Sequence, residues 1–138
     1  MNESQLIREL EFASFPENIN LIEALVEDLK HQLNLSDELE ANILVSLSEA
    51  FNNAIIHGNK LDPNKIVKLK IQLINNEIIF LIEDKGEGFN ADSIQDPTAP
   101  QNIDKPTGRG IFLIKNLADR LEFLDGGRIA LVSFVMNS

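Results

Sequence analysis

The chain has 138 residues, of which 22 are acidic and 12 basic, so it carries a formal charge of −10, and 43% of its residues are apolar. This length fits one domain, and the apolar fraction excludes a disordered chain. The absence of cysteine excludes a disulfide scaffold and a thiolate metal site, and it is typical of a reducing compartment. An acidic chain without a basic stripe argues against direct binding to nucleic acid.

The N-terminal segment, MNESQLIRELEF, has neither the basic nor the apolar region of a signal peptide. The longest apolar run, residues 78–82, is far shorter than the roughly 20 residues of a membrane-spanning helix. We therefore expect a single cytoplasmic domain over residues 1–138 that makes no contact with a membrane.

The first part of the chain predicts a strand and two helices. Residues 6–15 have a strand pattern, and residues 20–33 carry apolar side chains at helical spacing. Ser36 is a suitable N-cap for a second helix, which we expect to run to about His57 and to end at Gly58.

Two strands, a long loop, a helix and a hairpin are predicted next. Residues 67–73 alternate between apolar and polar, and residues 77–83 return after a turn as a more buried strand. Residues 85–110 hold four of the seven glycines and few large apolar side chains, which is typical of a functional loop. A short helix over 111–121 and a hairpin over 122–136 follow. The order predicts an α+β fold, a two-layer sandwich with helices on one face of a mixed, mostly antiparallel sheet.

The second helix carries a polar stripe beside its buried face. At about 100° per residue, Glu49, Asn53 and His57 lie along the border of that face. A carboxylate can deprotonate a hydroxyl or water, and an amide oxygen suits Mg²⁺. The same spacing is also typical of a solvated helix flank, and His57 of a residue at the negative end of a helix dipole. The expected buried face comprises Leu39, Ile43, Leu44, Leu47, Ala50, Phe51, Ala54 and Ile55.

Two glycine-rich segments could approach a ligand. Asp84 ends a buried strand and precedes Gly86 and Gly88, so its carboxylate could accept a hydrogen bond from an exocyclic amine, although such residues are also common in ordinary turns. Residues 107–110 (TGRG) enter a helix, where backbone N–H groups can bind phosphate, or they form a simple hinge. Neither segment has the spacing of a dinucleotide-binding motif or a P-loop.

Taken in order, these segments resemble the GHKL, or histidine-kinase-like, ATPase superfamily, and within it the short anti-sigma-factor serine kinases. Residues 48–58 (SEAFNNAIIHG) resemble the N-box of that family, residues 84–89 (DKGEGF) its G1 box, and residues 108–111 (GRGI) its G2 box. The resemblance spans about residues 4–136. It implies the Bergerat fold, with an ATP lid at about residues 89–110, and it implies ATP and Mg²⁺ as cofactors.

The resemblance also implies a role for each matching residue. Glu49 corresponds to the catalytic general base, Asn53 to the Mg²⁺ ligand and Asp84 to the residue that reads adenine. Gly86 and Gly88 would leave space beside the base. The residues that would cradle the phosphates at the end of the lid are Thr107, Gly108, Arg109, Gly110 and Ile111, with His57 in a weaker role beside the phosphates.

Two positions depart from the family pattern. Pro106 stands where anti-sigma kinases often place a basic residue, and Lys105 or Arg109 would have to replace that charge. The last box usually reads Gly-Thr, whereas this chain has Gly127-Arg128. The first departure bears on phosphoryl transfer more than on nucleotide binding.

The implied function is an ATP-dependent serine/threonine protein kinase that is also an anti-sigma factor. It would phosphorylate a STAS-domain anti-anti-sigma protein and sequester a sigma factor by partner switching. The alternatives are a non-catalytic ATP-binding regulator that exchanges partners, or a histidine-kinase-type catalytic module acting on a separate phosphoacceptor. The family commonly forms dimers, so a homodimer is also expected.

Overall fold

The computed structural model describes residues 4–86 and 106–136, so Gly88 and most of the expected lid lie outside the described residues. No helix in these two ranges is long and apolar enough to span a membrane. The elements are β1 (Ser4–Ala13), η1 (Pro16–Ile19), α1 (Asn20–Leu33), α2 (Asp37–Asn52), η2 (Asn53–Gly58), β2 (Ile66–Ile74), β3 (Glu77–Glu83), α3 (Pro106–Leu117), β4 (Arg120–Leu124), η5 (Asp125–Gly127) and β5 (Ile129–Val135).

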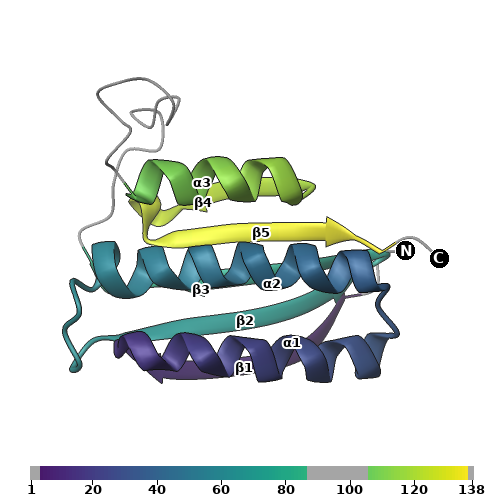
Figure 1. Ribbon diagram of the computed structural model, residues 1–138, viewed down its shortest axis with the longest axis horizontal. Helices are drawn as coiled ribbons and strands as arrows, with labels where there is room; N and C mark the ends of the chain where they lie inside the picture. The colour runs from purple at the N-terminus through teal and green to yellow at the C-terminus, as the bar shows by residue number, and fades with distance from the viewer. Residues whose placement is uncertain (1–3, 87–105, 137–138) are drawn as a thin grey trace.

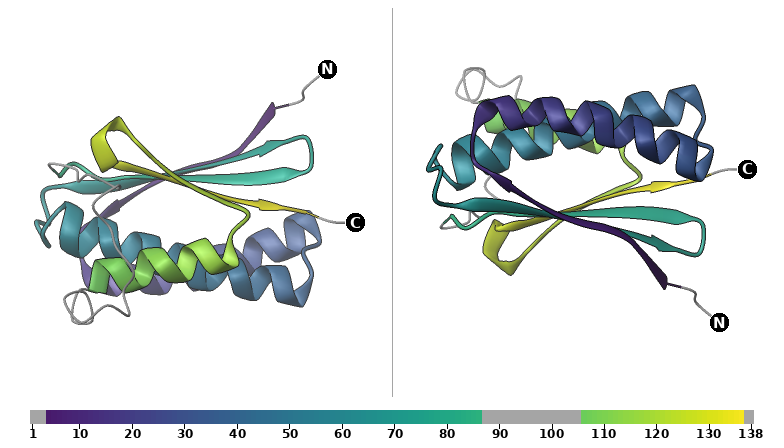
Figure 2. Two further views of the ribbon diagram at one scale, coloured as in Figure 1. Left: turned by 90° about the horizontal axis from the view of Figure 1, so that it is seen from above. Right: turned by 90° about the horizontal axis from the view of Figure 1, so that it is seen from below.

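The five strands form one sheet in the order β1-β2-β3-β5-β4 (Figure 1). Each pair of neighbours is antiparallel, so the parallel component expected of a mixed sheet does not occur among the described strands. The three α-helices of residues 4–86 and 106–136 lie on one face of this sheet, and no helix within these ranges covers its other face (Figure 2). This arrangement confirms the predicted two-layer α+β sandwich.

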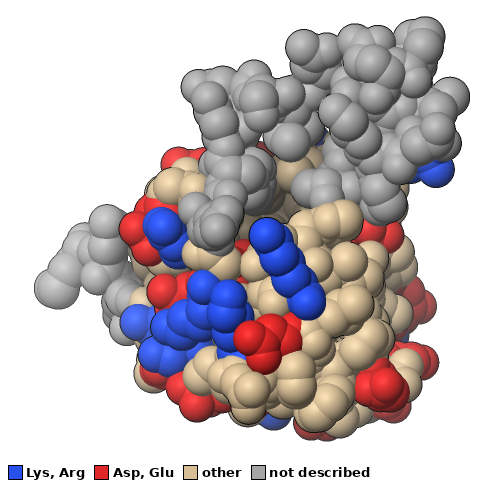
Figure 3. Space-filling model, turned by 90° about the vertical axis from the view of Figure 1, so that its left-hand side faces the viewer, with Lys and Arg blue, Asp and Glu red and all other residues tan. Residues whose placement is uncertain are grey.

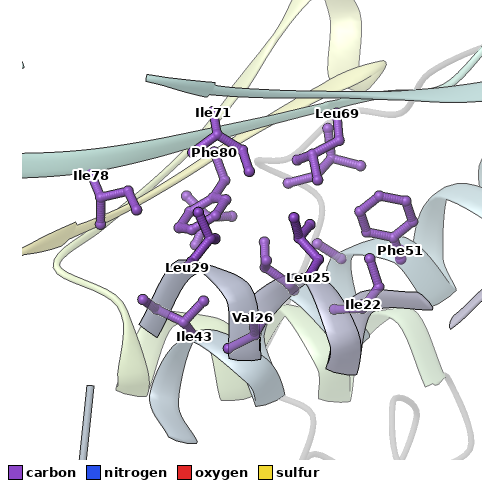
Figure 4. Close-up of a cluster of buried hydrophobic side chains, with 14 of the residues drawn as sticks. Ile22, Leu25, Val26, Leu29, Ile43, Phe51, Leu69, Ile71, Ile78 and Phe80 are labelled. Atoms are coloured by element: carbon purple, nitrogen blue, oxygen red, sulfur yellow. The ribbon is translucent and has the colours of Figure 1, made fainter. Parts of the chain in front are cut away.

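The hydrophobic core lies between the helices and the covered face of the sheet (Figure 4). Alternate β2 residues Val67, Leu69 and Ile71 are fully buried there, as the period of two predicts. Phe51 of α2 meets Phe12 of β1 edge to face, with ring centroids 5.3 Å apart. Burial of these apolar side chains fixes α2 on the sheet. Glu49 lies on α2, and Asn53 and His57 lie on η2, which continues it.

Helices α1 and α2 begin and end largely as the sequence predicts. The α1 helix spans residues 20–33 and ends at Asn34 in the left-handed conformation (φ 54°). The α2 helix is capped by Ser36, whose Oγ accepts a hydrogen bond from the Leu39 N–H at 3.1 Å. The helical path continues to Gly58 as predicted, but its last part, residues 53–58, is a π-helix, η2, with a wider turn than an α-helix.

Two other elements have bounds that differ from the expected ones. Strand β1 spans residues 4–13 rather than 6–15, and α3 spans residues 106–117 rather than 111–121. Proline suits the first position of a helix, which accounts for the earlier start of α3. The helix ends early because Asp119 joins the sheet: its N–H donates to the Ser133 carbonyl at 2.9 Å, and its Oδ2 accepts from the Val135 N–H at 2.6 Å.

The Ser36 cap gives a direct test of this packing. Ser36→Ala removes the acceptor for the Leu39 N–H and should lower the free energy of unfolding by about 1 kcal/mol. Urea denaturation measures the change, and Ser36→Asp is the matched control because it keeps a capping oxygen. Equal losses in the two variants would contradict the assignment of the cap.

Candidate functional site

Four segments meet at one end of the sheet, the left-hand end of Figure 1. They are η2, the end of β3, the start of α3, and the turn between β4 and β5. A cavity of about 200 Å³ opens beside them, and Ile114 lines it from the second half of α3. Its polar lining comes from Asn53, His57, Asp84 and Arg128, and its apolar walls include Ile82, Ile114 and Phe123.

Asp84 is the most buried charged group of the cavity, with 9% of its surface exposed. It directly follows β3, where its Oδ1 accepts a hydrogen bond from the Gly86 N–H at 2.8 Å. Burial raises the pKa of the Asp84 carboxyl above its ordinary value, while the Gly86 N–H and the positive charge of Arg128 act in the opposite direction. The protein thus holds a desolvated hydrogen-bond acceptor against the cavity.

Two glycines let η2 pack directly on this carboxylate. A Cβ atom at Gly58 would lie 2.3 Å from Asp84 Oδ2, and a Cβ atom at Gly86 would lie 2.1 Å from the Gly58 carbonyl oxygen. Side chains are excluded at both positions, because real Cβ contacts are never this short. The space beside Gly86 is therefore occupied by the backbone of Gly58.

The polar stripe of α2 and η2 faces the start of α3. A Cβ atom at Gly110 would lie 2.8 Å from Glu49 Oε2 and 3.4 Å from Asn53 Nδ2. The structure therefore brings Glu49, Asn53 and Gly110 together, although more than 50 residues separate the two segments in sequence. His57 is exposed and also lines the cavity.

The glycine-rich segment that precedes Ile111 belongs to the first turns of α3. The backbone N–H groups of Thr107, Gly108 and Arg109 have no acceptor within the helix, because the first turn of any helix lacks such partners. Arg109 is exposed. The Ile111 side chain is 2% exposed and packs into the interior, so this residue could meet a ligand only through its backbone.

The sequence reasoning missed Asn59, which is fully buried at the end of η2. Its Nδ2 donates to Ser14 Oγ at 2.8 Å and to the Ile66 carbonyl at 3.1 Å, and its Oδ1 accepts from the Lys85 N–H at 2.7 Å. Only its position directly after Gly58 could have drawn attention to it. Arg128 was noticed as a departure from a motif, but its place in the cavity was not foreseen.

Basic side chains gather at this end of the molecule, although the whole chain carries a charge of −10 (Figure 3). Lys60 and Lys65 lie in the segment between η2 and β2, Lys85 follows β3, and Arg128 precedes β5. Such local positive charge attracts an anionic ligand toward the cavity.

Comparison with known proteins identifies the class to which this fold and site belong. The profile of the family described as "Histidine kinase-like ATPase domain" matches residues 12–134, so the chain belongs to this family. An anti-sigma F factor from Clostridium perfringens is 31% identical over 117 residues, which cover 82% of each chain. These findings confirm the predicted resemblance.

Two further relatives and a solved structure agree. An anti-sigma F factor from Bacillus cytotoxicus is 29% identical over 94% of this chain and 92% of its own. The serine-protein kinase RsbW from Oceanobacillus iheyensis is 25% identical over 80% of this chain and 74% of its own. A crystal structure of the RsbU and RsbW domains of a Mycobacterium tuberculosis protein has the same fold, with a TM-score of 0.62 and 12% identity over 94% of this chain and 32% of that longer one.

The glycine contacts predict opposite effects for two alanine substitutions. Gly86→Ala forces a methyl group against the backbone of Gly58 and should lower the free energy of unfolding by about 1–3 kcal/mol. Gly110→Ala places a methyl group tightly against the flexible end of Glu49 and in ordinary contact with Asn53 Nδ2. Alanine favours a helix by about 1 kcal/mol, so stability should hold or rise. Urea denaturation of both variants tests the pair, and equal stabilities would contradict the close approach at Gly86.

Proposed function

We propose that this chain is an ATP-dependent serine/threonine protein kinase and an anti-sigma factor. The observation that supports the proposal best is the meeting of three distant segments: Asp84 lies at one part of the cavity, while Asn53 and Glu49 face the start of α3. Phosphoryl transfer needs groups that bind the nucleotide, the metal and the phosphates, and one that accepts a proton. Asp84 would bind adenine, Asn53 would hold Mg²⁺ and Glu49 would accept the proton. The free N–H groups at the start of α3 would bind phosphate.

ATP would bind with its base at Asp84 and its phosphates at the first turn of α3. The buried carboxylate of Asp84 is an acceptor for the exocyclic amine of adenine, and the apolar walls Ile82 and Ile114 suit an aromatic ring. Backbone N–H groups of Thr107, Gly108 and Arg109, together with the positive end of the helix, would hold the phosphates.

The donor set fits Mg²⁺. Among the described residues, no group of three His, Cys, Asp or Glu side chains could hold a metal ion on its own. Mg²⁺ commonly takes one or two protein ligands and completes its shell with water and phosphate oxygens, so the amide of Asn53 beside Glu49 suffices. When bound, the ion would neutralise charge on the phosphates.

Glu49 would accept the proton of the attacking hydroxyl group. Its half-buried carboxylate lies beside Gly110, next to the phosphate-binding turn. General-base assistance of this kind contributes about 10²- to 10⁴-fold to a rate.

The acceptor would be a serine or threonine of a STAS-domain anti-anti-sigma protein, and the same chain would sequester a sigma factor when that antagonist is phosphorylated. The names of the relatives, anti-sigma F factor and serine-protein kinase, support this role. We place the exchange of partners in the cytoplasm and expect the chain to act as a homodimer.

A second candidate is an ATP-binding regulator that exchanges partners without catalysis. Pro106 favours it, because this residue begins α3 where related kinases often carry a cation. Labelled ATP and Mg²⁺, incubated with STAS-domain proteins from the same genome, would distinguish the two: transfer of label to one of them supports the kinase.

The assignment of Glu49 predicts a separation of binding from transfer. Glu49→Gln keeps the shape of the side chain and should leave ATP affinity within about threefold, while phosphoryl transfer falls by about 10²-fold or more. Calorimetry measures the affinity, and incorporation of label measures the transfer. Transfer at the wild-type rate would show that Glu49 is not the base.

We expect the substitution Asp84→Asn to weaken ATP binding without lowering the stability of the protein. The raised pKa means that ionisation of Asp84 disfavours the folded state, so the neutral amide should leave the free energy of unfolding at pH 7 equal or higher. This advantage should vanish below the ordinary pKa of aspartate, where the wild-type carboxyl is protonated in both states.

ATP affinity of the same variant should fall by about tenfold or more, because a hydrogen bond to a charged acceptor is lost. Calorimetry at pH 7 measures it beside urea denaturation. Unchanged affinity would contradict the role of Asp84 in reading the base.

A further inference from the structure

The segment that follows β3 is held from two sides by side chains of other elements. On one side, Asn59 Oδ1 accepts the Lys85 N–H at 2.7 Å. On the other, Arg128 Nε donates to the Gly86 carbonyl at 2.9 Å, and the Arg128 carbonyl accepts the Asp84 N–H at 2.9 Å. The backbone of residues 84–86 is therefore fixed at each residue.

Asn59, the first residue that hydrogen-bonds this segment, is itself held firmly in place. It is fully buried, and its Nδ2 bonds both Ser14 Oγ and the Ile66 carbonyl. Ser14 Oγ in turn donates to the Lys65 carbonyl at 2.5 Å. Asn59 thus links the segment after β3 to the end of β1 and the start of β2, and a fully bonded buried network of this kind resists rearrangement.

Arg128, the second residue that hydrogen-bonds this segment, is held in place by the turn before it. Its Nη1 donates to the Asp125 carbonyl at 3.0 Å. The turn has positive φ at Asp125, Gly126 and Gly127 (50°, 65° and 93°), which directs that carbonyl back toward the guanidinium. Arg128 also lines the cavity together with Asp84.

We propose that Asn59 and Arg128 are a pair of positioning residues that fix Asp84 for recognition of the base, and so set the preference of the cavity for a purine that carries an amino group. The proposal rests on the proposed function, in which Asp84 reads adenine. Hydrogen bonds weaken steeply away from their preferred angle, so a carboxylate on a loosened segment loses discrimination before it loses its place in the fold.

The inference extends the site to positions outside the family motifs matched above. Asn59 follows the N-box segment, and Arg128 stands where the family pattern has threonine. Arginine differs from threonine there because its fork-shaped group reaches two carbonyls at once, those of Gly86 and Asp125.

The test compares two nucleotides that differ only in the amino group. Affinities for ATP and for purine riboside triphosphate, which lacks the exocyclic amine, are measured by calorimetry for the wild type, Asn59→Ala and Arg128→Ala. The wild type should bind ATP about tenfold or more tightly than the analogue, as one hydrogen bond to a charged acceptor supports. In each variant this ratio should fall to about threefold or less. Loss of the Arg128 charge lowers affinity for both triphosphates alike, so the ratio reports on the amino group alone.

A purely structural role would give a different result. General loosening of the cavity would weaken both nucleotides equally and leave the ratio unchanged, and that outcome would overturn the proposal. The matched control is Ile43→Val, a core substitution in α2, which should lower stability and keep the ratio. The Arg128 side chain is 39% exposed, so Arg128→Ala decides the question even where Asn59→Ala is too unstable to measure.

The affinities of the wild type distinguish a failure of the proposed function from a failure of the positioning roles. If the wild type itself binds ATP and the analogue equally, Asp84 does not read the amino group, and the positioning role falls with it. If the wild type discriminates and both variants still do, only the roles of Asn59 and Arg128 are overturned.

Discussion

The site depends on one close approach, in which the backbone of Gly58 packs on the carboxylate of Asp84 and Gly86 packs on Gly58. No other residue type has a side chain small enough for either contact. The approach joins the end of a helix to the end of a strand, and it leaves Asp84 largely shielded from water. The geometry of the cavity, the ionisation of Asp84 and the path of η2 all follow from this contact.

Burying a carboxylate has a cost, and the fold offsets it with polar groups from several elements. The Gly86 N–H bonds Asp84 directly, and the charge of Arg128 stabilises its ionised form. The remaining desolvation cost lowers the stability of the fold at Asp84. Such a cost is typical of a functional position, where a bound ligand supplies the hydrogen bonds that the protein lacks. The rest of the core, with Phe51 packed against Phe12, supplies the stability that allows this.

The sequence predicted the elements better than their ends. The α1 helix and strand β3 were predicted at their observed bounds because periodicity and turn residues agree there. The start of α3 was missed because Gly108 and Gly110 look like loop residues, and its end because Ala118 and Leu121 continue the helical spacing. In both cases tertiary contacts decided the boundary, and a single sequence does not contain them.

The sequence predicts candidate motif residues, whose roles stay predictions, but it does not predict the residues that hold them in place. Glu49, Asn53 and Asp84 stand out because their types and spacing match a known chemistry. Asn59 does not, because one buried asparagine in a loop has no periodic pattern, and its partners lie on other strands. Long-range hydrogen bonds of this kind become visible only when the chain is folded.

The π-helical turn ties the site to an exact number of residues. A π turn holds one residue more than an α turn, so η2 already absorbs one extra residue, and a further residue inserted in 53–57 would rotate everything after it by about 100°. Asn59 would then swing out of its buried position, and Gly58 would no longer face Asp84. This stretch should therefore keep its length strictly among relatives, whereas the loop from 60 to 65 has far more freedom to grow or shrink.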